Sequence, residues 1–394
     1  MLIFPYFCKY FYTMTRLYLY SLLSILFINS LLTTSYAQNT VQGSFVFGGI
    51  NRTYRLYVPA NYASSNAVPL LLNLHGYGSN NVEQEQYGDF RPIADTAGFL
   101  VLHPNGTPDN NGVNHWNTFG TSNVDDIGFL SALIDTISNH YNVDASRIYS
   151  TGMSNGGFMS YGLACSLSNK IAAVASVTGT MTTANFMTCM PSHPIPVMHI
   201  HGTADATVPY NGNAFFLSVP NIVNHWVDFN NTEANAVFTN IPDINTNDGC
   251  TAELYQYFNG DNGVWVEHYK IIGGGHSWPG APVNINTTNM DFSASQVIWQ
   301  FLRKFNRSGL ISTAETAAPP QLVVGPNPAN GSVNVKLTEE GEYILTLCDA
   351  SGRQLWQTKT NDNQLLIKLE TNGFYLLKVS NGSATSYFKV LNQR

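Results

Sequence analysis

The chain has 394 residues, of which 44% are hydrophobic and 11% charged, and its formal net charge is −7. This length and apolar content are sufficient for one large and one smaller domain, and they exclude a largely disordered chain. The acidic balance, without a cluster of Lys and Arg, argues against nucleic acid as a partner and favours neutral substrates.

The N-terminal segment, residues 1–37, contains Lys9 and Arg16 but no acidic residue. An apolar run at 17–32 follows, and the segment ends in small residues at Ala37. This order predicts a secretory signal peptide that is cleaved after Ala37. A membrane anchor is the alternative, but the run is shorter than the roughly 20 apolar residues of a membrane helix. We therefore expect a secreted protein, extracellular or at the cell surface, with no stable membrane span after cleavage.

The next part of the chain alternates between strand and helix patterns. Residues 45–59 predict a β-hairpin around Gly48 and Gly49. A helix is predicted at 125–141, where apolar residues form one stripe and acidic residues begin the first turn. Short apolar runs without alternation, typical of strands covered on both faces, occur at 68–76, 98–106, 147–152, 171–179 and 195–202. Strands that alternate with helices predict an α/β fold with a mostly parallel central sheet.

The C-terminal part has a different pattern. A helix predicted at 291–305 closes the catalytic region, and alternating strands with turn signals then predict a small all-β module. Its aromatic residues Trp356, Tyr375 and Phe388 are expected in the core of that module. The predicted organisation is a signal peptide at 1–37, a catalytic domain at 38–308, a linker at 309–321 and a β-rich domain at 322–394.

Cysteines outside the signal peptide are Cys165, Cys189, Cys250 and Cys348. An exported protein can form disulfides, and four cysteines allow three pairings. Cys165 with Cys189 is preferred, because both flank the strand-like segment 171–179. No CxxC or His/Cys spacing suggests a zinc site, so we predict no metal.

The pentapeptide GMSNG, residues 152–156, fits the G-x-S-x-G pattern, with Ser154 at its centre. In this pattern the serine occupies a strained strand-to-helix turn, and glycines are needed because side chains there would collide with the neighbouring strand and helix. Strand-like residues 147–151 precede it and helix-like residues 157–167 follow it. An ordinary glycine-rich turn is the alternative, but the context favours Ser154 as a nucleophile.

A serine nucleophile needs a base and a group that orients the base. His276 is the predicted base, because it lies in a glycine-rich loop after an apolar run. Asp205 is the predicted acid, at the end of a predicted strand. His199 and His201 belong to that strand and its exit, where satisfied core imidazoles are the better interpretation.

The remaining site predictions concern the oxyanion and the pocket. The backbone N–H of Asn155, directly after the nucleophile, and that of Tyr77, in the loop 75–80, are predicted oxyanion donors. Trp116 and Trp278 are candidates to line the substrate pocket by stacking on an aromatic acyl group or a sugar ring, or else simply pack.

Taken together and in order, the segments LLNLHGYG, LVLHPNG with HWN, DDIGFLSALID, YSTGMSNGGFMSYGLAC, PVMHIHGTADATVPY and GHSWPG resemble the secreted polyhydroxybutyrate depolymerase and feruloyl esterase family of α/β-hydrolases. The resemblance covers about residues 40–305. It implies an α/β-hydrolase fold and a cofactor-free ester hydrolase that uses Ser154, Asp205 and His276. Tyr77 departs from the family, since many relatives carry a small residue there, and its bulk could narrow the acyl pocket.

Residues 322–394 resemble the type A C-terminal sorting domain of the type IX secretion system, through VGPNPANGSVNV, DASGRQLW and NGFYLLKVSNGSATSYFKVL. The resemblance implies transit through the periplasm, recognition by the type IX secretion machinery and removal of the tail on export. An adhesive β-sandwich, such as a carbohydrate-binding module, is the alternative.

These observations predict a secreted serine esterase that releases feruloyl or acetyl groups from plant polysaccharide. A polyhydroxybutyrate or related polyester depolymerase is the first alternative, and the lack of a dedicated substrate-binding domain counts against it. The second alternative is a non-catalytic surface binding protein on a degenerate hydrolase scaffold, which the three intact candidate residues disfavour.

Overall fold

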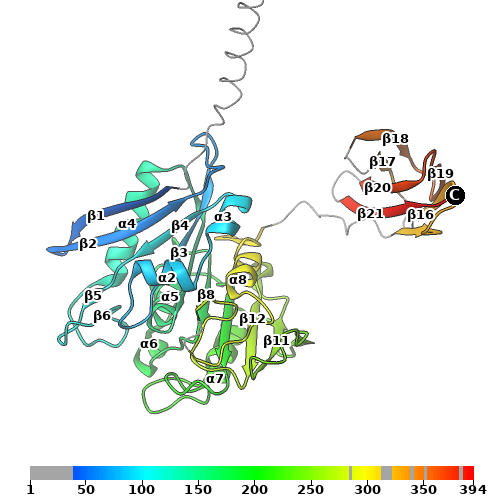
Figure 1. Ribbon diagram of the computed structural model, residues 1–394. Helices are drawn as coiled ribbons and strands as arrows, with labels where there is room; N and C mark the ends of the chain where they lie inside the picture. Colours follow the sequence, from blue (N-terminus) through cyan, green and yellow to red (C-terminus); the bar gives the residue numbers. More distant parts are fainter. Residues whose placement is uncertain (1–38, 284–285, 312–321, 338–340, 350–352, 381–384) are drawn as a thin grey trace, which may run out of the picture. The chain divides into compact units, whose positions relative to one another are not determined.

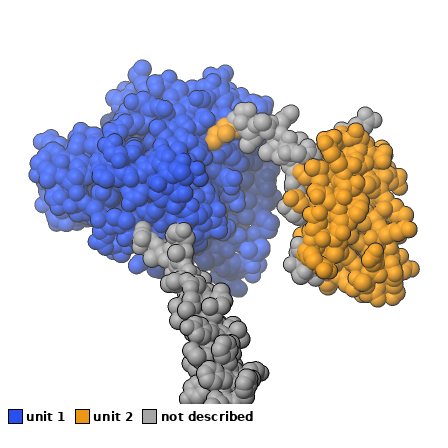
Figure 2. Space-filling model, turned by 90° about the horizontal axis from the view of Figure 1, so that it is seen from above, with its two compact units in different colours: residues 1–310 blue, residues 311–394 orange. Residues whose placement is uncertain are grey.

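The structure is a computed structural model in which two compact units, residues 1–310 and 311–394, are distinguished (Figure 2). The predicted signal peptide at 1–37 and most of the predicted linker at 309–321 lie outside the described residues. The structure describes residues 39–283, 286–311, 322–337, 341–349, 353–380 and 385–394.

A ten-stranded sheet forms the centre of the first unit (Figure 1). Its six middle strands are parallel, in the order β4 (Leu100–Pro104), β3 (Val68–Leu74), β7 (Val143–Met153), β8 (Ala173–Val177), β9 (Val197–Gly202) and β12 (Val266–Ile272). Antiparallel strands complete both edges, with β1 (Asn39–Phe47) and β2 (Ile50–Val58) beside β4, and β11 (Thr251–Tyr257) and β10 (Val237–Asn240) beside β12.

Helices cover both faces of this sheet (Figure 1). One buried core contains side chains of α4 (Asp126–His140), α5 (Asn155–Ser166) and α7 (Val219–Phe229), and the other contains side chains of α3 (Arg91–Ala97) and α8 (Ala294–Leu302). In β3, Leu70, Leu72 and Leu74 belong to the first core and Leu71 to the second. Because both faces of the strand are buried, its sequence is continuously apolar. The predicted α/β-hydrolase fold with a mostly parallel sheet is confirmed.

The remaining elements are short. They are α2 (Asn81–Tyr87), α6 (Thr183–Thr188), the 3-10 helix η1 (Asp261–Gly263) and the strand pairs β5 (Thr107–Pro108) with β6 (Asn114–His115) and β13 (Phe305–Asn306) with β14 (Gly309–Leu310). The last pair extends the first unit two residues beyond the predicted boundary at 308.

Side-chain caps explain where α4 and α8 begin. Asp125 caps α4, because its carboxylate accepts the N–H of Gly128 at 2.7 Å. The last helix, α8, begins three residues later than the predicted Asp291. Asp291 accepts the backbone N–H groups of Ile244 and Asn245 instead, and Ser293 caps the helix.

The preferred cysteine pairing is confirmed. A disulfide joins Cys165, in α5, to Cys189, directly after α6, with their Cα atoms 4.7 Å apart. Cys250 and Cys348 are free cysteines. The bridge ties the helix that follows Ser154 to the loops at the carboxyl end of β8.

The second unit consists of two antiparallel sheets around one apolar core. Tyr375 is buried in this core and Phe388 packs against it, as predicted, whereas Trp356 is 38% exposed, so its predicted place in the core is wrong. The sheets are β15 (Leu322–Gly325), β16 (Ser332–Leu337) and β19 (Gln364–Lys368), and β18 (Gln354–Thr360), β17 (Tyr343–Asp349), β20 (Gly373–Ser380) and β21 (Thr385–Asn392). Within the described ranges of the chain, no helix is long and apolar enough to cross a membrane.

Candidate active site

Ser154 lies at a sharp turn between β7 and α5. Its backbone has φ 54° and ψ −119°, a conformation that costs a non-glycine residue of the order of 1–3 kcal/mol. The Ser154 N–H donates to the carbonyl oxygen of Val177, the last residue of β8, at 2.8 Å. This bond fixes the turn to the neighbouring strand β8, and Ser154 lies at the carboxyl end of the sheet.

The two glycines of the pentapeptide are required by close packing. A Cβ on Gly152 would lie 2.6 Å from the carbonyl oxygen of Leu74 and from the carbonyl carbon of Gly156. A Cβ on Gly156 would lie 2.1 Å from the same Leu74 oxygen. Any side chain at either position would displace the neighbouring strand or the helix start, which is the collision predicted from the sequence.

Glycines also bring together the loops that follow β9 and β12. These two parallel strands are neighbours, so their carboxyl ends are adjacent. A Cβ on Gly202 would lie 2.2 Å from the carbonyl oxygen of Gly274. The N–H of Ala204 donates to that oxygen at 2.9 Å, and the N–H of Gly273 donates to the hydroxyl of Thr203, also at 2.9 Å. This close approach places Asp205 beside His276.

Asp205 and His276 are directly hydrogen-bonded. The Nδ1 of His276 lies 2.7 Å from the Oδ2 of Asp205, whose side chain is fully buried, while that of His276 is 13% exposed. The other carboxylate oxygen accepts the N–H groups of Thr207 at 2.9 Å and Val208 at 2.8 Å. A carboxylate bonded in this way fixes both the orientation and the Nδ1–H tautomer of the imidazole.

Electrostatics favour the ionised form of Asp205. Burial alone would raise the pKa of this carboxyl group, but hydrogen bonds from His201 and His276 outweigh it and hold the pKa below its ordinary value. The carboxylate is therefore charged throughout the neutral pH range, available to stabilise a positive imidazolium.

Ser154 stands at the same edge of the sheet as this pair. It follows β7, Asp205 follows β9 and His276 follows β12, and these parallel strands are arranged in the order β7, β8, β9, β12. The carboxyl ends of parallel strands share one edge, where α/β folds bind their ligands. The structure thus brings Asp205 and His276 into contact and places Ser154 at the same edge.

The two predicted oxyanion donors flank Ser154. A Cβ on Gly76 would lie 3.5 Å from the Cβ of Ser154, so the loop containing Tyr77 packs against the turn. The N–H of Tyr77 has no acceptor among the described residues, whereas the next two N–H groups donate to Asn114 and Gly76. Asn155 begins α5, and the first N–H groups of a helix have no partner within it. Both amides can therefore donate to a bound oxyanion.

The Tyr77 side chain does not fill the interior of the site. It is 50% exposed, and its hydroxyl donates to Asp109 at 2.6 Å. The preceding His75 is fully buried, bonds the carbonyl oxygen of Gly76 through Nδ1 and accepts the N–H of Gly106 through Nε2. Burial lowers the pKa of His75 to about 4, in keeping with a neutral structural imidazole.

The Asn155 side chain was not singled out from the sequence, yet it organises the site. Its Oδ1 accepts the N–H of Trp116 at 2.6 Å, and its Nδ2 donates to the Trp116 carbonyl at 3.1 Å and to the Thr118 hydroxyl at 2.7 Å. These bonds tie the first turn of α5 to the loop after β6. The only sequence signal was the HWN segment that contains Trp116.

Neither tryptophan predicted to line the pocket has a face that substrate could reach. Trp116 is 0% exposed and donates through its indole to the His75 carbonyl. Trp278 is 2% exposed, packs edge-on against Phe90 and donates to Ser295. Both belong to the core, so the packing alternative applies to them.

A different set of aromatic side chains surrounds a cavity at this end of the molecule. The cavity has a volume of about 430 Å³, within the range of small-molecule sites, and is lined by residues 119–120, 182–185 and 214–216. The rings of Phe119 and Phe216 pack on Phe158, which lies in the first turn of α5 after Ser154. No spacing pattern revealed this cavity, because its walls come from two loops and the start of α6, which are far apart in the sequence.

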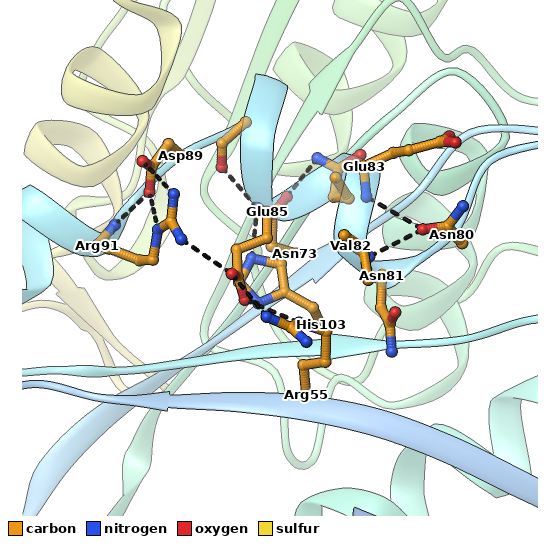
Figure 3. Close-up of polar contacts among 12 residues, drawn as sticks. Arg55, Asn73, Asn80, Asn81, Val82, Glu83, Glu85, Asp89, Arg91 and His103 are labelled. Atoms are coloured by element: carbon orange, nitrogen blue, oxygen red, sulfur yellow. Dashed lines mark hydrogen bonds and ion pairs between the residues drawn. The ribbon is translucent and has the colours of Figure 1, made fainter. Parts of the chain in front are cut away.

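An ionic network anchors α2, which follows the Tyr77 loop. Glu85 accepts two hydrogen bonds from Arg55 of β2, at 3.1 and 3.0 Å, and one from Arg91 of α3 at 2.9 Å (Figure 3). Beneath it, Asn73 of β3 lies 3.2 Å from the Nε2 of His103 in β4. Burial lowers the pKa of His103 to about 4, so the positive charges in this network come from the arginines.

Replacing Glu85 with glutamine is expected to lower the free energy of unfolding by about 1–3 kcal/mol, because the partly buried Arg55 guanidinium then lacks its ionic partner. Urea denaturation measures this loss. Asp135→Asn is the control, since its pair with Lys170 is exposed and contributes less than about 1 kcal/mol. Equal losses in the two variants would contradict this account of the network.

The described residues contain no group of three or more His, Cys, Asp or Glu side chains that could hold a metal ion.

Comparison with known proteins places this site in context. A bifunctional acetylxylan esterase/xylanase of Neocallimastix patriciarum is 30% identical over 266 residues, which are 68% of this chain and 35% of that protein. Feruloyl esterase B of Piromyces equi is 29% identical over 231 residues, 56% of this chain and 41% of that protein. The chain thus spans less than half the length of these two relatives. The solved acetyl xylan esterase from Aspergillus awamori aligns over 60% of this chain and 94% of its own, with 16% identity and a TM-score of 0.44.

Two family models match separate parts of the chain. Residues 52–210, which include Ser154 and Asp205, match the model described as Esterase PHB depolymerase. Residues 323–393 match the Secretion system C-terminal sorting domain. The chain therefore carries an esterase domain of the PHB depolymerase family, followed by a secretion-system C-terminal sorting domain.

Proposed function

We propose that the chain is a secreted carboxylic ester hydrolase that uses Ser154 as nucleophile, His276 as general base and Asp205 as orienting carboxylate. The observation that carries this proposal is the 2.7 Å hydrogen bond between His276 and Asp205, at the sheet edge where Ser154 occupies its strained turn. A base oriented by a carboxylate near a serine on such a turn is the arrangement that acyl transfer requires.

In the first half of the reaction, Ser154 Oγ attacks the ester carbonyl carbon while His276 Nε2 accepts the hydroxyl proton. Asp205 stabilises the imidazolium that forms. The N–H groups of Asn155 and Tyr77 bind the oxyanion of the tetrahedral intermediate. The intermediate expels the alcohol, which takes its proton from His276, and leaves an acyl group on Ser154.

In the second half, water attacks the acyl-enzyme and His276 accepts its proton. The tetrahedral intermediate collapses, Ser154 leaves with that proton and the carboxylic acid is released. The balanced outcome is one ester and one water converted into one acid and one alcohol, with no redox change and no cofactor.

Feruloyl or acetyl esters of plant polysaccharide are the proposed substrates. Relatives bearing the names acetylxylan esterase and feruloyl esterase support this class. The cavity lined by Phe119, Phe215 and Phe216 adds support, because aromatic walls suit a phenyl ring. The sorting domain at 323–393 supports export through the type IX secretion machinery, which gives the enzyme access to a polymer outside the cell.

A polyester depolymerase is the second candidate, favoured by the description of the family that residues 52–210 match. Hydrolysis of methyl ferulate by the purified chain, compared with clearing of a polyhydroxybutyrate suspension, separates the two. We expect ferulate release without clearing, and no reaction with Ser154→Ala as control. Clearing of the suspension with methyl ferulate untouched would reverse the order of the candidates, and inertness toward all esters would support a binding protein.

A further inference from the structure

A line of buried polar side chains leads from α5 to Asp205. The hydroxyl of Tyr161 lies 2.7 Å from the Nδ1 of His199, and the Nε2 of His199 lies 3.1 Å from the Nδ1 of His201. The Nε2 of His201 lies 3.3 Å from the Oδ2 of Asp205. Tyr161, His199 and His201 are 0% exposed. Buried polar groups need hydrogen-bond partners, and these groups lie within hydrogen-bonding distance of one another. The network therefore fixes which nitrogen or oxygen atom carries each hydrogen.

The acceptors at the Asp205 end determine the direction of these hydrogen bonds. The Nε2 of His201 faces the Asp205 carboxylate and, at 2.8 Å, the carbonyl oxygen of Val208. Both groups only accept, so Nε2 must carry hydrogen, and in the neutral ring the Nδ1 of His201 must accept. The Nε2 of His199 then donates to it.

The same reasoning continues to the far end. The Nδ1 of His199 must accept, and the Tyr161 hydroxyl donates to it. Burial, together with the neighbouring imidazoles, lowers the pKa of His199 well below its ordinary value, and burial raises the pKa of Tyr161 well above its own. Both groups are therefore neutral, as this arrangement requires.

We propose that His201 is a positioning residue for the reaction: its Nε2–H, which donates to the Val208 carbonyl oxygen, also faces the Asp205 oxygen that His276 binds, and Tyr161, acting through His199, keeps His201 in the tautomer that donates. The expected effect on kcat rests on the proposed function, whereas the hydrogen-bond arrangement does not. Oδ2 of Asp205 lies 2.7 Å from the Nδ1 of His276 and 3.3 Å from the Nε2 of His201. We expect loss of the His201 contact to allow the carboxylate to rotate away from His276. His201 does not touch substrate.

Two variants whose new side chains have equal length distinguish the effect of hydrogen-bond donation from the effect of packing. In His201→Gln, the terminal amide can donate to Asp205, whereas in His201→Met the similarly shaped side chain cannot. We expect His201→Met to lower kcat for p-nitrophenyl acetate by roughly 10- to 100-fold at unchanged KM, the effect of losing a hydrogen bond to a charged group, and His201→Gln to restore kcat to within about threefold of wild type.

His268→Met is the matched control. His268 is a buried histidine opposite His199 on the adjacent strand, and it bonds the His199 carbonyl and the Tyr210 hydroxyl rather than Asp205. We expect it to lower thermal stability and leave kcat nearly unchanged. Equal kcat values for His201→Met and His201→Gln, or an equal kcat loss in His268→Met, would overturn the proposal.

Proton NMR of the full chain provides a readout that does not depend on hydrolysis. The deshielded Nδ1 proton shared by His276 and Asp205 should persist in wild type and His201→Gln, and broaden or shift in His201→Met. An unchanged signal in all three overturns the inference. If the signal differs among the three proteins in this way but wild-type protein hydrolyses no ester, only the proposed function is contradicted and the inference stands.

If His201→Met does not unfold cooperatively on heating, Tyr161→Phe tests the same line by removing a single oxygen. We expect it to lower kcat by about two- to tenfold at unchanged KM, because His199 loses the donor that fixes its tautomer. An unchanged kcat in this variant overturns the inference.

Discussion

Replacing Ser154 with alanine is expected to lower kcat/KM for p-nitrophenyl acetate by at least about 10⁴-fold, because no other group in the site can form the acyl-enzyme. Alanine removes only Oγ and keeps the N–H bond to Val177. The fold is therefore expected to survive, with the thermal midpoint within a few degrees of wild type. Initial-rate measurements on purified protein, after circular dichroism confirms folding, check this result.

Ser160→Ala is the control for this experiment, because Ser160 lies further along the same helix. Its buried hydroxyl bonds Ser150 and the carbonyl oxygen of Gly156, a structural role. We expect this variant to lose stability and to keep turnover within a few fold of wild type. Wild-type turnover in Ser154→Ala would exclude Ser154 as the nucleophile.

Asp205→Asn is expected to lower kcat by about 10⁴-fold with little change in KM. The asparagine carbonyl oxygen must face the N–H groups of Thr207 and Val208, which only donate. Its NH₂ group then points toward His276 Nδ1 and favours the tautomer in which Nδ1 accepts. In that tautomer Nε2 carries hydrogen and cannot take the proton from Ser154.

The expected loss in kcat without a change in KM makes this prediction specific. A binding defect would raise KM, whereas a wrong tautomer lowers kcat and leaves KM unchanged. Asp248→Asn is a suitable control, because Asp248 also accepts backbone N–H groups, from Cys250 and Met290, in a loop without a histidine partner. Full kcat in Asp205→Asn would contradict the role assigned to this carboxylate.

Much of the fold could be predicted, because its central strands are buried on both faces. Continuous apolar runs such as 68–76 and 195–202 are typical of strands in that environment. The edge strand β10 was not predicted, since its four residues, 237–240, are all exposed and its apolar and polar residues do not alternate. Helix α8 was placed three residues too early, because side-chain bonds of Asp291 to another loop are not encoded in helical periodicity.

The candidate site was predictable to the extent that its chemistry is local in sequence. Ser154 is a candidate from the sequence because its glycines and flanking elements form one short pattern, and Asp205 and His276 are candidates because each follows a recognisable strand. For Trp116 and Trp278 the sequence left pocket lining and core packing open, because residue type does not reveal burial. The line of Tyr161, His199 and His201 required the pairing of α5 with β9, which only the fold supplies.

We propose that the pair of His276 and Asp205 makes Ser154 nucleophilic. Incubation with diethyl p-nitrophenyl phosphate, followed by peptide mass analysis, tests it most directly, because transfer of the phosphoryl group to an activated serine releases p-nitrophenolate. We expect one diethylphosphoryl group per chain, on the peptide that contains Ser154, and much slower labelling of Asp205→Asn. Inactivation with the group on another residue, or equally fast labelling of Asp205→Asn, would contradict the account.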